Sequence, residues 1–407
     1  MAKTSDVPKF GMLSGIKVFS TGTVVAAPFA AMLMAENGAT VIHAESTVAP
    51  DTCRSIKYAW NQEHRNELAL AINIPTPEGK EIFFKMIKWA DIWIESSKGG
   101  TFTKWGLSDE VLWKENPKLV IVHISGFGQE GDPAYVNRAS YDAIGQAFGG
   151  YMFINGMPEP NPPQRAVPYT CDYVTALNAA WSALAAYIKV KETGKGESLD
   201  FAQFEMMTKI QLHYPMTYFM DKKVLMRQGN ADPSFAGYTA YKCKDGNYVF
   251  IGLVGGGPMK RALPLLGLVG DPDFPAGIQL ALKTTPAGKK LDQAVQAYCD
   301  KYPAEQVDKQ LMEADVPCSI IYSIDMAEKN SHFEARKVFA EWDDPQYGKV
   351  KGVNVFPHAK NNPPEIWRGA PLYGMDNDDV LKEFGYTKEQ IDELYTKGVL
   401  KAGEGCH

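Results

Sequence analysis

Short apolar segments alternate with amphipathic ones along the first part of the chain, and this alternation constrains the fold more than any other feature. Apolar runs predict strands at 16–20, 40–45, 91–95 and 119–124. Helical periodicity predicts helices at 29–37, 77–89 and 109–115. Pro28 stands where the first of these helices begins, and Gly38 where it ends. Strands that alternate with helices indicate a doubly wound parallel sheet.

The pattern of elements changes after about residue 220. Before that point, small residues predict a long helix at 175–192, and a strand is expected at 198–201. After it, we expect a β-hairpin at 241–251 turning at Asp245-Gly246, helices at 289–314 and an amphipathic helix at 378–398. The chain is therefore predicted to be α/β, with a large doubly wound domain over 1–220 and 329–407 and a smaller α+β domain over 221–328.

The bulk composition excludes several classes of function. With 407 residues the chain is long enough for two domains, and its formal net charge of -6 offers no general footprint for nucleic acid. A local basic pocket can still bind a polyanionic cofactor. No apolar run reaches membrane length and the N-terminal residues lack an apolar signal core, so we expect a cytoplasmic protein with no membrane partner.

The six cysteines are scattered without metal-like or disulfide-like spacing. No Cys-x-x-Cys pair occurs, and no Cys/His cluster has the spacing of a zinc site. We therefore expect neither a disulfide framework nor a metal cofactor.

Asp172 is the carboxylate of greatest interest, because it follows the Pro168-Tyr169 turn and precedes the helix predicted from Thr175. It can be an N-cap that accepts hydrogen bonds from the first helix N–H groups. It can also be a reactive group held by the positive helix end. Residue chemistry alone favours the cap, because Asp is among the commonest N-cap residues.

Other motifs are weaker. Gly126-Phe-Gly128-Gln-Glu-Gly131 matches a dinucleotide-binding pattern, but Asp132-Pro133 follows where a helix should open, which favours an ordinary glycine-rich loop. His43, His123 and His213 have apolar neighbours in sequence and are interpreted as packed histidines rather than as bases. Cys171, beside Asp172, has no local partner that would lower its pKa, so we expect it to be buried and inert.

Two further segments carry candidate binding residues. Gly255, Gly256 and Gly257 follow the predicted hairpin, and three consecutive glycines can offer N–H donors to an oxyanion, close over a substrate, or form a mobile turn. Lys98 and Lys104 follow the strand predicted at 91–95. The carboxyl ends of such strands bind ligands in doubly wound folds, so these lysines suit phosphate, although a solvated surface is the alternative.

Taken in order, these segments and several others resemble the class III CoA-transferases, also called the formyl-CoA transferase or carnitine dehydratase family. The resemblance covers nearly the whole chain and includes Gly38–Glu45, Ser125–Gly128, Tyr141–Gly150, Thr193–Gly196 and Val316–Cys318. It is strongest with the L-carnitine CoA-transferase branch, through Pro8–Gly11, Glu95–Gly99, Pro168–Asp172 and Asn361–Gly369.

The resemblance implies that Asp172 is a nucleophile, which reverses the weighing made from residue chemistry. Asp172 would attack an acyl-CoA thioester, form a mixed anhydride and then become an aspartyl-CoA thioester. Gly255, Gly256 and Gly257 correspond to the family's closing and stabilising loop. The family's CoA-binding positions fall on six residues: Val25, Ala26, Lys98, Lys104, Tyr141 and Asp142.

The implied partners are an acyl-CoA, with coenzyme A as co-substrate, and a small carboxylic acid, carnitine or a related betaine being expected first. Transfer to 2-hydroxy, aryl or bile acids and a CoA-dependent racemase-like reaction are the alternatives, together with a non-catalytic CoA-binding protein. Ser46 and Trp105 depart from basic residues of relatives, which bears on the acyl group. Aromatic residues that could surround a trimethylammonium group are Tyr169, Tyr214, Tyr218, Phe219, Tyr238 and Tyr241. The resemblance also implies an interlocked homodimer.

Overall fold

The computed structural model describes residues 2–403. By its internal contacts the chain divides into two compact units. The first contains the residues up to Gly150, Ala166–Gln211 and the residues from Glu334 on, and the second contains Tyr151–Arg165 and Leu212–Phe333. These limits differ from the expected ones, because a short stretch before Ala166 joins the second unit and that unit begins earlier than residue 221.

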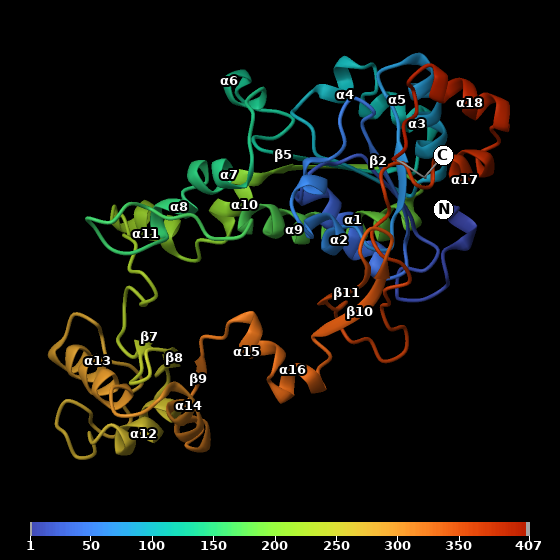
Figure 1. The fold of residues 1–407 in the computed structure, drawn as a ribbon. Helices are drawn as coiled ribbons and strands as arrows, with labels where there is room; N and C mark the ends of the chain where they lie inside the picture. Colours follow the sequence, from blue (N-terminus) through green and yellow to red (C-terminus); the bar gives the residue numbers. More distant parts are fainter. Residues whose placement is uncertain (1, 404–407) are drawn as a thin grey trace. The chain divides into compact units, whose positions relative to one another are not determined.

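The first unit is built on a six-stranded parallel sheet with the order β3-β2-β1-β4-β5-β6 (Figure 1). Its strands are β1 (Lys17–Ser20), β2 (Thr40–Glu45), β3 (Leu68–Ala71), β4 (Ile92–Glu95), β5 (Val120–Ser125) and β6 (Glu197–Ala202). The predicted doubly wound α/β fold is confirmed. The strand order reverses between β1 and β4, which is where such sheets bind ligands.

Small residues cover one face of the sheet. Helices α1 (Ala26–Glu36) and α9 (Thr170–Thr193) pack together against the valines and isoleucines of the central strands. Five alanines of α1 and four of α9 are buried in this layer. Because alanine projects only a methyl group, the two helices can approach each other and the sheet closely.

Larger side chains fill the opposite face, where α3 (Pro77–Trp89), α5 (Asp109–Glu115), α17 (Asn377–Glu383) and α18 (Lys388–Thr396) pack. Thr76 caps α3 by accepting from the N–H of Gly79, and Pro77 occupies its first turn. The single helix expected over 378–398 is in fact two. Gly385 lies between them with a φ of +89°, a conformation that glycine adopts without strain.

Smaller elements complete the first unit. They are η1 (Thr4–Asp6), η2 (Thr52–Ser55), α2 (Ala59–Glu63), α4 (Thr101–Lys104), α6 (Pro133–Val136), α7 (Asp142–Phe148), α10 (Gln203–Lys209) and the antiparallel pair β10 (Phe339–Asp344) and β11 (Gly348–Val353). Among these, α7 and α10 matter most for the site, because both pack against the start of α9.

The second unit is α+β and is built on a three-stranded antiparallel sheet of order β7-β8-β9. Its strands are β7 (Tyr238–Lys242), β8 (Tyr248–Gly252) and β9 (Cys318–Ile320). Its helices are α8 (Tyr151–Ile154), α11 (Tyr214–Asp221), α12 (Gly256–Leu265), α13 (Pro286–Cys299), α14 (Ala304–Glu313) and α15 (Ile324–Glu328), and α16 (Ser331–Ala335) lies at its end. Within residues 2–403, no helix combines the length and apolar character needed to cross a membrane.

Candidate active site

Asp172 lies in the first turn of α9 and is almost completely buried, with 7% of its surface exposed. The helix begins at Thr170, not at Thr175, so Asp172 is its third residue. The N-cap interpretation is therefore wrong. The cap position belongs to Tyr169, whose side chain makes no capping hydrogen bond. The Asp172 side chain instead accepts a short hydrogen bond at Oδ1 from Nε2 of Gln203.

The N-terminus of α9 is capped by a residue from another helix. Oδ1 of Asp142, in α7, accepts from the backbone N–H of Cys171 at 2.7 Å and of Asp172 at 3.3 Å. Gln146 donates to the other oxygen of Asp142 at 2.8 Å and also binds the backbone of Ala166 through both ends of its amide. This network ties the segment before α9 to α7 and fixes the direction of the first helical turn.

These surroundings make Asp172 a weaker acid than usual. Burial is the main cause, the nearby Asp142 carboxylate adds to it and the Gln203 hydrogen bond opposes it; together they raise the pKa of Asp172 to about 7. A carboxylate with such a pKa is more nucleophilic when ionised than an ordinary exposed one, yet is still ionised at neutral to mildly alkaline pH.

Asp172 and Gln203 line a cavity of about 230 Å³ where the strand order reverses. Four of the predicted CoA-binding residues also line it: Val25, Ala26, Lys98 and Tyr141. Val25 is the N-cap of α1 and Ala26 its first residue, while Lys98 follows β4, so the cavity lies at the carboxyl ends of the two central strands. Arg138, which lines it as well, adds a second exposed cation.

Sequence reasoning missed Gln203 and Arg138. Gln203 directly follows β6, at the same sheet edge as the other candidates, and this position was the signal that could have identified it. Arg138 lies in the irregular stretch after α6, and its guanidinium lies 5.4 Å from the ring centre of Phe127. No local pattern in the sequence distinguishes it from a surface arginine.

The remaining predicted residues lie elsewhere. Lys104 is an exposed residue at the end of α4 and is not among those that line the cavity. Asp142 contacts the backbone of α9 instead of lining the cavity. The glycine loop belongs to the second unit, where the N–H groups of Gly255 and Gly256 each donate to Gln279 at 2.8 Å.

The aromatic residues considered for a trimethylammonium group are divided between the two units. Tyr169 belongs to the first unit, where it packs against the cluster formed by Val25, Cys53, Trp60 and Ala370. In the second unit, Tyr241 is buried and donates to Asp292 at 2.7 Å. Tyr241 is therefore a core residue and offers no face to a ligand.

The three histidines that were expected to be packed in the core differ in burial and in their partners. His213 is exposed, which contradicts the prediction of a packed residue. His123 is buried between two carboxylates, 2.7 Å from Glu95 and 3.0 Å from Asp109. Burial alone would lower the pKa of His123, but these two partners outweigh it and raise the pKa to about 10, so His123 is a structural cation. Cys171 is fully buried as predicted, and burial raises the pKa of its thiol.

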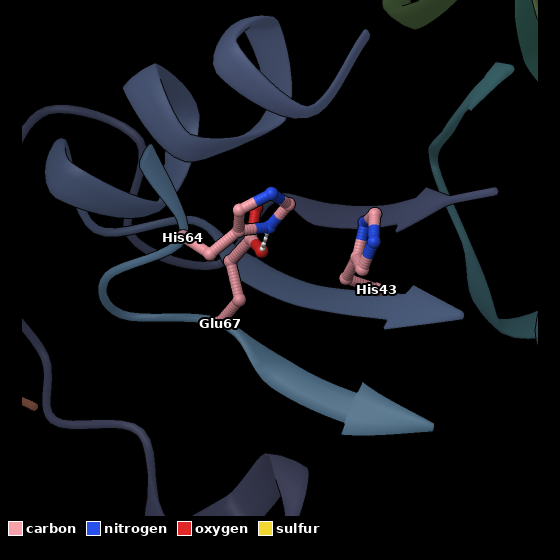
Figure 2. A group of neighbouring side chains, drawn as sticks. All are labelled: His43, His64 and Glu67. Atoms are coloured by element: carbon pink, nitrogen blue, oxygen red, sulfur yellow. Dashed lines mark hydrogen bonds and ion pairs between the residues drawn. The ribbon is translucent and has the colours of Figure 1, made fainter. Parts of the chain in front are cut away.

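His43, His64 and Glu67 form a second cluster of buried polar side chains (Figure 2). His43 lies within β2, and His64 and Glu67 lie between α2 and β3. His64 and Glu67 are hydrogen-bonded at 2.8 Å, while His43 binds Ser20 at 3.2 Å. Their potential ligand atoms all lie within 4.8 Å of one another.

Burial decides the protonation states of this cluster. It lowers the pKa of His43 to about 4 and lowers that of His64 well below its usual value. It also raises the pKa of Glu67 well above its usual value. Burial therefore favours the neutral forms of His64 and Glu67, which form a hydrogen-bonded pair in the core.

Comparison with known proteins agrees with this geometry. The model of the family described as CoA-transferase family III matches residues 13–377. The chain is 47% identical over 399 residues to the bile acid CoA-transferase BaiK of Clostridium scindens, covering 97% of this chain and 91% of that protein. It is 40% identical to the L-carnitine CoA-transferase of Proteus mirabilis over 409 residues, which cover 99% of this chain and all of that protein.

The fold is also similar to that of a solved structure. The crystal structure of a CAIB/BAIF family protein from Brucella suis aligns with a TM-score of 0.78 and 25% identity, covering 92% of this chain and 99% of that one. The family model spans most of the chain and both curated relatives are CoA-transferases by name. The chain therefore belongs to CoA-transferase family III and is an enzyme that uses coenzyme A as a co-substrate.

Proposed function

We propose that this enzyme moves CoA from an acyl-CoA to a second carboxylic acid through a covalent intermediate at Asp172. One observation carries the proposal: a buried carboxylate, with a pKa of about 7, lines the cavity at the sheet's reversal point. A carboxylate nucleophile needs no proton removed before it attacks. The exposed cations Lys98 and Arg138 at the same cavity suit the phosphates of CoA.

The reaction proceeds in four exchanges that balance without a net proton. An oxygen of Asp172 attacks the thioester carbonyl, the C–S bond breaks, and a mixed anhydride and CoA thiolate form. The thiolate attacks the aspartyl carbonyl and releases the first acid, leaving an aspartyl-CoA thioester. The second acid then attacks that thioester and displaces the thiolate. The thiolate attacks the new acyl carbonyl, which forms the product and frees the Asp172 carboxylate.

Trapping tests this mechanism directly. Incubation with an acyl-CoA and hydroxylamine should convert the Asp172 side chain to a hydroxamate, detectable by mass spectrometry of the peptide. Asp172→Asn should give neither the adduct nor CoA exchange. Turnover without any adduct at Asp172 would instead support the racemase-like alternative, which requires a general base and no covalent aspartyl species.

For the second acid we propose a bulky carboxylic acid of the bile acid type. The higher identity to the Clostridium scindens bile acid CoA-transferase supports it. Carnitine is the second candidate, supported by the Proteus mirabilis relative. Exchange assays with choloyl-CoA and with crotonobetainyl-CoA, each with a bile acid and with carnitine as the acceptor, separate the two candidate acids. Faster exchange between crotonobetainyl-CoA and carnitine would make carnitine the first candidate.

We also propose a cytoplasmic interlocked homodimer, in which Lys104 contributes to CoA binding and the loop of Gly255, Gly256 and Gly257 closes over the site. The outer face of α9 is consistent with contact to a second chain, because three of its apolar side chains have more than half of their surface exposed: Leu177, Trp181 and Ile188. Light scattering should give the mass of two chains, and a monomeric mass would contradict the proposal. Lys104→Gln should raise the KM for acyl-CoA.

A further inference from the structure

The amide of Gln203 is the hydrogen-bond donor to the Asp172 side chain in the described part of the chain. Gln203 is the first residue of α10, immediately after β6, and only 6% of its surface is exposed. Its Nε2 donates to Oδ1 of Asp172, and no hydrogen bond to Oδ2 occurs within residues 2–403. The two oxygens of this carboxylate are therefore not equivalent.

The position of Gln203 is set by three helices. The thiol of Cys171, in α9, donates to the backbone carbonyl of Gln203 at 3.5 Å. On the other side, α7 approaches at Gly145, where an added Cβ would lie 2.6 Å from Sγ of Cys171 and 3.2 Å from Cβ of Gln203. Only glycine permits this approach, so α7, α9 and α10 together hold the amide against Asp172.

We propose that Gln203 is a positioning residue that holds Oδ1 of Asp172, leaves Oδ2 to attack the acyl carbonyl, and then stabilises the oxyanion formed at Oδ1. This inference rests on the proposed function. After the first attack, Oδ2 becomes the bridging oxygen of the anhydride and Oδ1 its carbonyl oxygen. When CoA thiolate adds to the aspartyl carbonyl carbon, the negative charge forms on Oδ1, and the bond to Oδ2 breaks as that charge collapses.

An amide N–H already directed at Oδ1 needs no reorganisation when that charge develops, which is the condition for effective oxyanion stabilisation. Alternative donors are less well placed. In the second unit, the N–H groups of Gly255 and Gly256 already donate to Gln279. Backbone N–H of Asp172 itself points to Asp142. The side chain of Gln203 is thus a donor of the first unit that already contacts Asp172.

Gln203→Met removes the donor while keeping an unbranched side chain of similar length. We expect kcat and kcat/KM to fall by the same factor, about 10²-fold or more, since the interaction strengthens only in the transition state. We also expect the rising limb of the pH profile of kcat/KM to move to higher pH, because a donor to the ionised carboxylate is lost. A merely structural role for Gln203 would leave this limb in place.

Gln211→Met is the matched control. Its amide donates to the carbonyl oxygens of Gly149 and Met207 and has no contact with Asp172, so its kcat and pH profile should match the wild type. Gln203→Glu is isosteric and preserves packing if the methionine variant fails to fold. Its rate loss should deepen as pH rises and the introduced carboxyl ionises beside Asp172.

The outcomes separate this inference from the proposed function. If the wild type shows no hydroxamate at Asp172, the proposed function fails and the inference falls with it. If the wild type is trapped but Gln203→Met matches Gln211→Met in kcat and keeps the pH limb of the wild type, the function stands and the role of Gln203 is refuted.

Discussion

Asp142 holds the helix that carries the proposed nucleophile, because its Oδ1 lies 3.3 Å from the backbone nitrogen of Asp172 and 2.7 Å from that of Cys171. The same carboxylate that orients Asp172 therefore also opposes its ionisation. Capping and pKa adjustment are two consequences of one contact. A substitution at Asp142 can separate the capping of the helix from the effect on the pKa of Asp172.

Asp142→Asn should shift the rising limb of kcat/KM to lower pH. The asparagine oxygen can still accept from the helix N–H groups, while the like charge that raises the pKa of Asp172 disappears. The pH dependence of the initial exchange rate measures this shift. Asp132→Asn is the control, because Asp132 caps α6 at Ala134 and should leave the limb unchanged. An unshifted limb in Asp142→Asn would show that burial alone sets the pKa.

Asp172→Asn should stabilise the fold, and more so at high pH. A raised folded pKa means that the favourable neutral state is present below the unfolded value near 3.8 and is lost as pH rises through about 7. The wild type therefore carries a penalty that grows between these values and is constant above them. We expect the variant to be more stable by about 4 kcal/mol at pH 8 and by less at pH 5. Urea unfolding at the two pH values measures the difference, and equal stability of both proteins at pH 8 would contradict it.

Glu67→Gln should make the fold more stable at pH 7 and by less at pH 5, although it removes a buried carboxyl group. Burial raises the pKa of Glu67 in the folded protein, so the wild type loses stability as pH rises above the unfolded value, and the neutral amide has no such loss. The variant should also resist alkaline pH better, because the wild type loses stability as pH rises through the raised pKa of Glu67. Glu67→Ala, which leaves a cavity and an unpaired His64, should lower the melting temperature; equal losses in both variants would indicate an ionised pair.

His123→Gln should destabilise the enzyme by about 3 kcal/mol, because Glu95 is 1% exposed and would lose its cationic partner. The raised pKa of His123 stabilises the fold fully below its unfolded value near 6.5, and this stability is lost as pH rises through about 10. Thermal unfolding from pH 6 to 10 should show the wild type converging on the variant. Lys189→Gln, which breaks an exposed pair with Glu192, should change stability little.

Local patterns predicted most of the first unit well. The bounds of α3 and α5 agree with the expected ranges 77–89 and 109–115, since Pro77 and the acidic first turn of α5 are start signals that act within a few residues. Strand β3 was not expected. Its sequence, Leu68–Ala71, has no β-branched residue and is too short to show alternation, so only its pairing with β2 identifies it.

The start of α9 shows where local reasoning ends. Pro168 and the small residues after Thr175 suggested a later start and a cap at Asp172. The helix begins at Thr170 because Asp142, thirty residues earlier, satisfies its first N–H groups. A capping residue from another helix leaves no trace in the sequence around the cap.

By itself, the sequence determined the doubly wound sheet, and it predicted the edge at which ligands bind and, through its family pattern, the choice of Asp172. These follow from short-range periodicity and from the order of elements along the chain. Only the tertiary structure decided that Asp142 caps α9 and that Gln203 binds Oδ1 of Asp172. Both contacts join residues about thirty positions apart, and they form because α7, α9 and α10 pack closely around Gly145.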